Sequence, residues 1–208
     1  MPVLLRIDSS AGGADSRSRR ITDELAGAWL ARGEEFSVVA RDLNASPPPH
    51  LGDTAQHWPE RLRGGAVLDA GTAALQGELI AELLAADAVV IGAPMYNYTF
   101  PSTLKAWLDF VHVPGVTAPF DEPTQPLAGR PAVIVSARGA TDDDGAFEHV
   151  FAPLRLALGD GLGMDVHVVS TSRTLADAVP DLDAALAAEE LARALDRVRE
   201  LGASLPAT

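Results

Sequence analysis

The most constraining feature of this sequence is residues 88–111, where a short apolar run leads into a polar turn and an amphipathic helix. The run at 88–91 is uninterrupted and β-branched, which is typical of a parallel strand buried on both faces. Gly92 and Pro94 then let the backbone leave the sheet. The next apolar residues recur at i, i+3, i+4 and i+7, as on one face of a helix: Leu104, Trp107, Leu108 and Val111. Residues 95–98 are therefore expected in a tight turn at the carboxyl end of a strand.

This turn is placed where open α/β sheets bind their ligands. Its residues are Met95, Tyr96, Asn97 and Tyr98. Flat, polarizable side chains and free backbone N–H groups suit a planar heteroaromatic ring. The alternative is an ordinary strand–loop–helix connection whose aromatic side chains pack inward.

The whole chain alternates strands with helices. Strands are expected at residues 3–7, 36–40, 88–91, 132–135 and 165–169, and helices at 18–32, 71–86, 102–111, 147–158 and 182–201. The Pro-rich segment 44–59 is expected to lack regular structure. This alternation predicts one α/β domain over residues 1–208, with a doubly wound five-stranded parallel sheet in the order 2-1-3-4-5 and helices on both faces. Strands one, three and four are neighbours in that order, so the loops at 9–18, 94–101 and 136–145 should converge at one edge.

The first of these loops is suited to a phosphate. It carries four serines and two glycines immediately before a helix: Ser9, Ser10, Ser16, Ser18, Gly12 and Gly13. Free backbone N–H groups and the positive end of the helix dipole attract an anion at such a place. Three arginines at 17, 19 and 20 add positive charge nearby. The alternative is that Ser16 or Ser18 only caps the helix, and the loop has neither a Walker A nor a GxGxxG pattern.

The second loop also carries a family resemblance. Residues 94–98 (PMYNY), followed by 101–105 (PSTLK) and 107–109 (WLD), resemble the flavin loop of the FMN-dependent NADH:azoreductase and NAD(P)H quinone reductase family, which has a flavodoxin-like fold. The resemblance extends more weakly over residues 3–201. It implies that this loop runs along the isoalloxazine ring of FMN, that the first loop holds the FMN phosphate, and that residues 136–140 approach the pyrimidine side. The cofactor-binding residues so implied are Ser10, Ser16, Arg17, Ser18, Pro94, Met95, Tyr96, Asn97, Tyr98, Ser136, Ala137, Arg138, Gly139 and Ala140.

The resemblance implies an FMN-dependent oxidoreductase. Hydride would pass from NADH or NADPH to the flavin, and then to a quinone, an azo compound or a similar planar acceptor, in a ping-pong mechanism. The cofactor carries this chemistry, and no catalytic residue is assigned. The choice of electron donor is open, because the acidic run at 142–144 is either a solvated turn or a barrier to nucleotide phosphates. The alternatives are a flavodoxin-like electron carrier and a flavin-free binding protein, since fold alone does not fix function.

Two long loops, 44–59 and 112–130, are expected to contribute to the site or to an interface. In the resembling family, the equivalent loops wall the site and contact the second subunit of a homodimer. Phe100 and Phe120 are candidates to line the acceptor pocket, and the core or the interface is an equally good place for either.

Composition excludes other classes of function. The net charge of −13 argues against nucleic acid as a partner. No apolar run approaches the roughly 20 residues that span a membrane, and the absence of cysteine fits a reducing compartment, so we expect a cytoplasmic protein. The five histidines are scattered without metal-ligand spacing, so no metal site is predicted.

Overall fold

The computed structural model describes residues 1–121 and 123–207, and within them five parallel strands form one sheet in the order β2-β1-β3-β4-β5. The strands are β1 (Val3–Asp8), β2 (Ser37–Asp42), β3 (Ala88–Gly92), β4 (Pro131–Ala137) and β5 (Asp165–Thr171). The main helices are α1 (Arg17–Leu30), α2 (Ala70–Ala85), α3 (Ser102–Val111), α4 (Glu148–Arg155) and α5 (Ala184–Ser204). The predicted order and alternation are confirmed. Element ends shift by a few residues; α5, for example, begins after Asp183, whose carboxylate accepts the N–H groups of Ala185 and Leu186.

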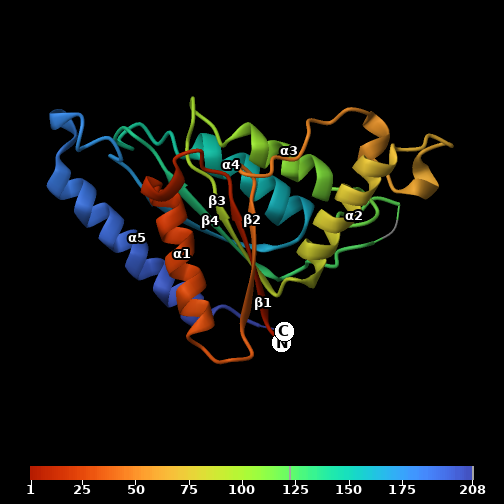
Figure 1. Cartoon of the computed structure of the whole chain (residues 1–208), viewed down its shortest axis with the longest axis horizontal. Helices are drawn as coiled ribbons and strands as arrows, with labels where there is room; N and C mark the ends of the chain where they lie inside the picture. The colour runs from red at the N-terminus through yellow and green to blue at the C-terminus, as the bar shows by residue number, and fades with distance from the viewer. Residues whose placement is uncertain (122, 208) are drawn as a thin grey trace.

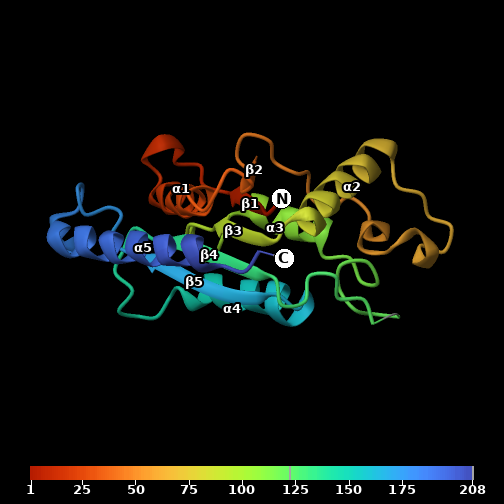
Figure 2. The same ribbon diagram turned by 90° about the horizontal axis from the view of Figure 1, so that it is seen from below.

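The helices cover both faces of the sheet. Figure 1 shows α1 and α5 on one side of the strands and α2 and α3 on the other, and Figure 2 shows the same layers after a quarter turn. Strand β3 is central and buried along its whole length. Its uninterrupted apolar sequence follows from this position, because side chains on both of its faces leave water.

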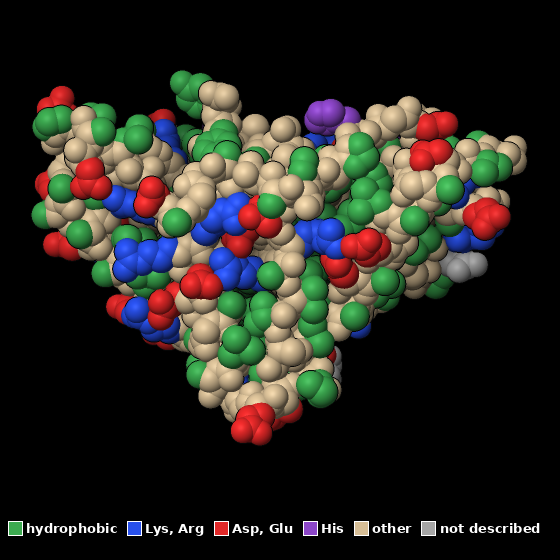
Figure 3. Space-filling view, in the orientation of Figure 1, with side chains coloured by type: hydrophobic (Ala, Val, Ile, Leu, Met, Phe, Trp, Pro, Cys, Tyr) green, Lys and Arg blue, Asp and Glu red, His purple; other side chains and the backbone are tan. Residues whose placement is uncertain are grey.

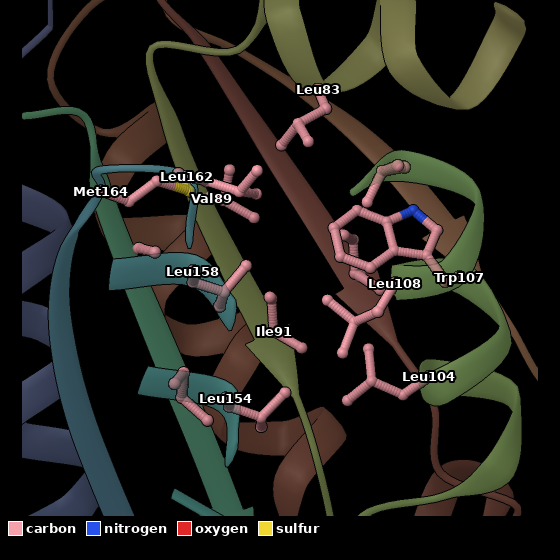
Figure 4. Close-up of a cluster of buried hydrophobic side chains, with 14 of the residues drawn as sticks. Leu83, Val89, Ile91, Leu104, Trp107, Leu108, Leu154, Leu158, Leu162 and Met164 are labelled. Atoms are coloured by element: carbon pink, nitrogen blue, oxygen red, sulfur yellow. The ribbon is translucent and has the colours of Figure 1, made fainter. Parts of the chain in front are cut away.

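The larger core lies between β3, α3 and the segment that contains α4. Figure 4 shows Val89 and Ile91 between the side chains of α3 and those of residues 154–164. Three of the four predicted α3 side chains, Leu104, Trp107 and Val111, are at most 1% exposed. Full burial of a side chain of this size contributes about 1.5–3 kcal/mol, so this packing holds the start of α3 next to the turn that precedes it.

The opposite core fixes α1. Leu4 of β1 and Val90 of β3 pack here with Ile21, Leu25 and Trp29 of α1. Helix α5 closes over α1 at Gly202, where an added Cβ would lie 2.6 Å from the Leu25 carbonyl oxygen. The two helices can approach this closely only because residue 202 has no side chain. As a result, the N-terminus of α1 is held at the carboxyl edge of the sheet.

One prediction about the loops is wrong. The segment expected to lack regular structure contains a helical turn, Thr54–His57, which Asp53 caps by accepting the Ala55 N–H. The buried Gln76 of α2 donates to the carbonyls of Gln56 and Phe110, so tertiary contacts stabilise the turn. In residues 1–121 and 123–207, no helix combines the length and the apolar character needed to cross a membrane.

Candidate functional site

The loops after β1, β3 and β4 converge as expected, around a cavity of about 510 Å³ that we call the edge cavity. Its lining residues come from four segments: Ser10, Gly12, Asp15, Ser16, Arg17, Ser18, Pro94, Met95, Tyr96, Ala137, Gly139, Thr174, Leu175 and Asp177. A volume in this range suits a small-molecule ligand.

The first loop brings hydroxyl groups to the N-terminus of α1. Ser16 caps the helix by accepting the Arg19 N–H at 3.3 Å, and its hydroxyl lies 3.1 Å from that of Ser18. The capping role considered from the sequence is therefore present at Ser16. Ser9 is used differently, because its hydroxyl donates to the Gly92 carbonyl at 2.6 Å. Ser10, Ser16 and Ser18 remain at the cavity wall, where the helix dipole favours an anion.

Tyr96 connects the first loop to the second. Its hydroxyl oxygen lies 3.1 Å from the Ser10 hydroxyl and accepts the Ala11 N–H at 3.1 Å. The two loops are therefore hydrogen-bonded to each other across the edge cavity, and each limits the movement of the other.

The turn after Tyr96 has an unusual backbone. Tyr96 and Thr99 exchange N–H to carbonyl bonds of 2.8 and 3.2 Å, and the two residues between them have positive φ, 49° for Asn97 and 70° for Tyr98. Positive φ at both central positions is the pattern of a type I′ turn, which Asn tolerates well. Tyr98 has no such tolerance and is 75% exposed, so this conformation costs about 1–2 kcal/mol at that residue.

Helix α4 anchors the same turn from the outside. The Thr99 hydroxyl donates to the His149 carbonyl at 3.3 Å. Pro153 lies four residues after His149 and has no N–H, so this carbonyl lacks its usual helical partner. The proline in α4 thereby leaves an acceptor for the turn.

The third loop contributes mainly backbone. Ala137 and Gly139 line the edge cavity, whereas Ser136 is fully buried and its hydroxyl has no hydrogen-bond partner among the described residues. Arg138 is 8% exposed and pairs with Asp144 at 2.7 Å and Asp142 at 3.2 Å, and the hydrogen bond that it donates to Asp144 is the main cause of its raised pKa. Both carboxylates also accept backbone N–H groups of the same loop. The acidic run is therefore a turn built around Arg138.

A fourth segment, residues 172–177, was missed by the sequence analysis. Its backbone continues the pairing of β4 with β5: Arg173 N–H donates to Ala140 at 2.9 Å, and Thr174 N–H donates to Arg138 at 3.0 Å. Glu190 of α5 accepts from the Ser172 backbone and from the Arg173 guanidinium. Leu175 lies against Gly139, where an added Cβ would be 2.7 Å from Leu175 Cδ1. No motif marks this segment, and only the adjacency of β5 to β4 could have indicated it.

Comparison with known proteins identifies the family. The family of proteins described as having a flavodoxin-like fold matches residues 3–199. An FMN-dependent NADH:quinone oxidoreductase from Kineococcus radiotolerans is 54% identical over 99% of this chain and 100% of its own length. Another from Streptomyces avermitilis is 38% identical over 93% of this chain and 91% of its own. The chain belongs to this flavodoxin-like quinone oxidoreductase family.

Several solved structures share the fold of this quinone oxidoreductase family member, although their sequence identity to it is lower than that of the relatives above. An azoreductase from Bacillus anthracis str. Sterne superposes with a TM-score of 0.81 at 19% identity, covering 98% of this chain and 99% of its own. An FMN-dependent NADH-azoreductase from B. anthracis str. Ames Ancestor, in complex with FMN, gives 0.76 at 20% identity, covering 97% and 98%.

The hydrogen-bond donors and charged groups that line the edge cavity fit the cofactor of the family. Its lining includes serine hydroxyls, Arg17 and the α1 N-terminus, which suit a phosphate. Met95 and Leu175 add apolar side chains to the lining, and Leu175 packs against Gly139. The carboxylates of Asp15 and Asp177 also line the cavity, and Arg17 offsets one of these two negative charges.

The predicted cofactor residues are only partly gathered here. Those that line the edge cavity are Ser10, Ser16, Arg17, Ser18, Pro94, Met95, Tyr96, Ala137 and Gly139. Asn97 lines an adjacent cavity of about 650 Å³ with Asn44, Phe100 and Lys105. Tyr98, Ser136, Arg138 and Ala140 do not line the edge cavity. Contact with the cofactor stays a prediction for all fourteen residues.

A third concavity, the apolar groove, has a volume of about 850 Å³ between residues 54–58, α3 and residues 153–161. Its residues are Thr54, His57, Trp58, Phe100, Lys105, Leu108, Asp109, His112, Pro114, Pro153, Leu156, Ala157, Asp160 and Gly161. Trp58 packs edge-on against Phe120, with ring centroids 5.0 Å apart. Burial lowers the pKa of His112 below its ordinary value. Leu156 and Phe120 are more than 60% exposed, so this region presents apolar surface to water.

Proposed function

We propose that this protein is an FMN-dependent NAD(P)H oxidoreductase acting on quinones, azo compounds or similar planar aromatic acceptors. One observation carries the proposal: the three loops form one cavity at the α1 N-terminus, in a chain 54% identical to an FMN-dependent NADH:quinone oxidoreductase. The chemistry that FMN supplies when bound is hydride transfer, from the nicotinamide to the flavin and then from the flavin to the acceptor.

The residues would divide this work by position. Ser10, Ser16 and Ser18 would donate to the phosphate with the N-terminus of α1, and Arg17 would supply charge. Pro94, Met95 and Tyr96 would hold one side of the ring, and the third loop would present backbone groups at the other.

The Asn97 turn would place its backbone N–H at the reactive edge of the ring. Asn97 borders the adjacent cavity together with Phe100 and Lys105, which offers a place for the donor and the acceptor in turn. Use of one place by both substrates requires a ping-pong sequence. Since Arg138 pairs with both Asp142 and Asp144 and offsets one of their two charges, these carboxylates are a reduced barrier to either NADH or NADPH.

Flavin extraction and kinetics test this function. FMN should be recovered from the purified protein or should bind it on reconstitution, and NADH or NADPH should bleach the bound flavin anaerobically. Quinone turnover should give parallel double-reciprocal lines. Recovery of FAD alone, or no flavin even after reconstitution, would refute the cofactor. Flavin reduction without turnover of any quinone or azo dye would favour the electron carrier.

A double variant tests the phosphate position. Ser10→Ala with Ser18→Ala should weaken FMN binding tenfold or more, because each hydrogen bond to a charged group is worth about 1.5–3 kcal/mol. An unchanged dissociation constant would place the phosphate elsewhere.

We further propose a cytoplasmic homodimer, in which the second subunit covers the apolar groove. Helix α3 and the loop after it supply Leu108 and His112 to the groove, and Leu156 lies opposite. Covering this surface would remove exposed apolar area from water. Phe100 lines both the groove and the cavity beside Asn97, so a partner seated there would also close the acceptor side.

A further inference from the structure

Arg19 binds the backbone of the first loop without lining the edge cavity. Its Nη2 donates to the Ser10 carbonyl oxygen at 2.6 Å and its Nε to the same oxygen at 3.3 Å. Nη2 and Nη1 also reach the two carboxylate oxygens of Asp42, at 2.8 Å each. The Arg19 side chain is 17% exposed and does not line the edge cavity. Its guanidinium therefore binds the Ser10 carbonyl and the Asp42 carboxylate, and its Nη1 also lies 4.0 Å from the Asp8 carboxylate.

Binding of the Ser10 carbonyl orients the peptide that follows it. A trans peptide is planar, so the C=O of Ser10 and the N–H of Ala11 point in opposite directions. With the carbonyl held toward Arg19, the Ala11 N–H faces the Tyr96 hydroxyl, which lines the edge cavity. If this peptide rotated, the Ala11 N–H would leave the Tyr96 hydroxyl, and Ser10, which lines the edge cavity, would be displaced with its backbone.

Asp42 holds Arg19 in this geometry. It lies at the end of β2 and accepts the backbone N–H groups of Asn44 and Ala45 at 2.9 and 3.1 Å, so it is itself fixed. Figure 3 shows basic and acidic side chains close together on the face that carries α1 and β2. A bidentate arginine–carboxylate pair sets direction as well as charge.

We infer that Arg19 is a positioning residue for the phosphate end of the cofactor. It acts through the Ser10–Ala11 peptide without touching the phosphate, and Asp42 sets its direction. This inference rests on the proposed function, because it requires the phosphate to bind beside Ser10.

Riboflavin has the same ring as FMN and no phosphate. Comparing its binding with that of FMN therefore distinguishes a role of Arg19 at the phosphate from a general effect on folding. We would titrate the flavin-stripped full chain with FMN and with riboflavin, following flavin fluorescence. Arg19→Gln should weaken FMN binding tenfold or more and change riboflavin binding less than about threefold. Arg19→Lys should lose most of the same affinity, because one ammonium group cannot bridge the carbonyl and the carboxylate in the plane that Arg19 uses.

Two further variants test whether Arg19 acts by orienting the Ser10–Ala11 peptide or by its positive charge. Arg20→Gln removes the same charge from the neighbouring, exposed residue and should change FMN binding less than about threefold. Asp42→Asn leaves more positive charge near the loop, so a purely electrostatic role predicts tighter FMN binding. A positioning role predicts weaker binding.

The inference is overturned if Arg19→Lys binds FMN like the parent chain, if Asp42→Asn binds it more tightly, or if Arg19→Gln weakens FMN and riboflavin equally. Loss of FMN affinity in the Ser10/Ser18 double variant, with none in Arg19→Gln, would refute only the role of Arg19. No loss in the double variant would refute the phosphate position and this inference with it.

Discussion

The edge cavity and the apolar groove are walled by different kinds of contact. Hydrogen bonds hold the loops of the edge cavity in place, including those of Tyr96 with Ser10, of Arg19 with Ser10, and of Arg173 with Ala140. The groove is walled largely by apolar side chains, including Leu108 and the exposed Leu156. Directional bonds fix the places of donors for a small polar ligand, whereas an apolar surface has no direction and is stabilised by any complementary surface that excludes water. The first region therefore suits a cofactor, and the second suits another protein surface.

The strongest test of this contrast is a charge in the groove. Leu156→Glu should convert a dimer into a monomer of 21.7 kDa, because a carboxylate buried in an apolar contact costs several kcal/mol. This cost corresponds to at least about a thousandfold weaker association. Light scattering over a concentration series measures the effect.

Leu175→Glu is the matched control, since Leu175 is 53% exposed, Leu156 is 63% exposed, and Leu175 lies at the edge cavity. It should leave the mass of the dimer unchanged. A parent chain that turns over as a monomer, or a Leu156→Glu variant that stays dimeric, would show that the groove is not the contact.

The second test concerns the turn beside the edge cavity. Asn97→Gly should keep flavin reduction within about twofold, because glycine adopts the φ of 49° without strain. Asn97→Ala should slow reduction up to about tenfold, because the left-handed conformation costs about 1–2 kcal/mol at alanine. Asn97→Pro removes the N–H and cannot adopt this φ, so it should be the slowest of the three.

Stopped-flow reduction rates of FMN-loaded variants measure this effect, with circular dichroism to check folding. Equal rates for the glycine, alanine and proline variants would show that the turn does not serve the flavin.

The third test measures how the pH dependence of stability is affected by His112, which lines the apolar groove. Burial lowers the pKa of His112 below its ordinary 6.5, so at acid pH the unfolded chain binds a proton that the folded chain does not. Stability should therefore fall as pH drops below about 6.5, by up to about 1.4 kcal/mol per pH unit, until the lowered pKa is reached.

His112→Gln should remove this slope in urea titrations between pH 5 and 7, whereas the exposed His50→Gln should keep it. An identical slope in the parent chain and His112→Gln would show that His112 is not responsible.

The smallest expected effect is at Asp42, behind the edge cavity. The hydrogen bond from Arg19 is the main cause that lowers its pKa from 3.8 to about 2. The folded state is therefore favoured above pH 3.8, and this contribution is lost as pH falls toward 2. The Asp42 side chain is 39% exposed, so solvent screening keeps the effect small.

Asp42→Asn should flatten the acid limb of the stability curve slightly, relative to an exposed control such as Asp143→Asn. A larger change in the control than in Asp42→Asn would contradict this assignment.

Much of the fold followed from sequence periodicity. The run at 88–91 could be read as a central strand because a strand buried on both faces must be apolar at every position. The stripe on α3 could be read because buried positions repeat at the helical period. Strand order then brought Ser10, Tyr96 and Gly139 to one edge, since loops after neighbouring parallel strands meet there.

The hydrogen-bond and ion-pair partners of each side chain could not be predicted from the sequence, because they depend on distances between segments far apart in the chain. Three arginines follow one another closely in the first loop and helix, and the sequence gives no reason to separate them. The tertiary structure sends Arg19 to Asp42 and Ser10, while Arg17 remains at the edge cavity. It also closes the cavity with Leu175, which carries no motif, because β5 lies beside β4. The sequence alone therefore determined that the loops after β1, β3 and β4 meet, because the periodicity of burial predicts the strands that they follow. Only the tertiary structure added residues 172–177 and decided which atoms bond, because hydrogen bonds and ion pairs depend on distances of a few ångströms.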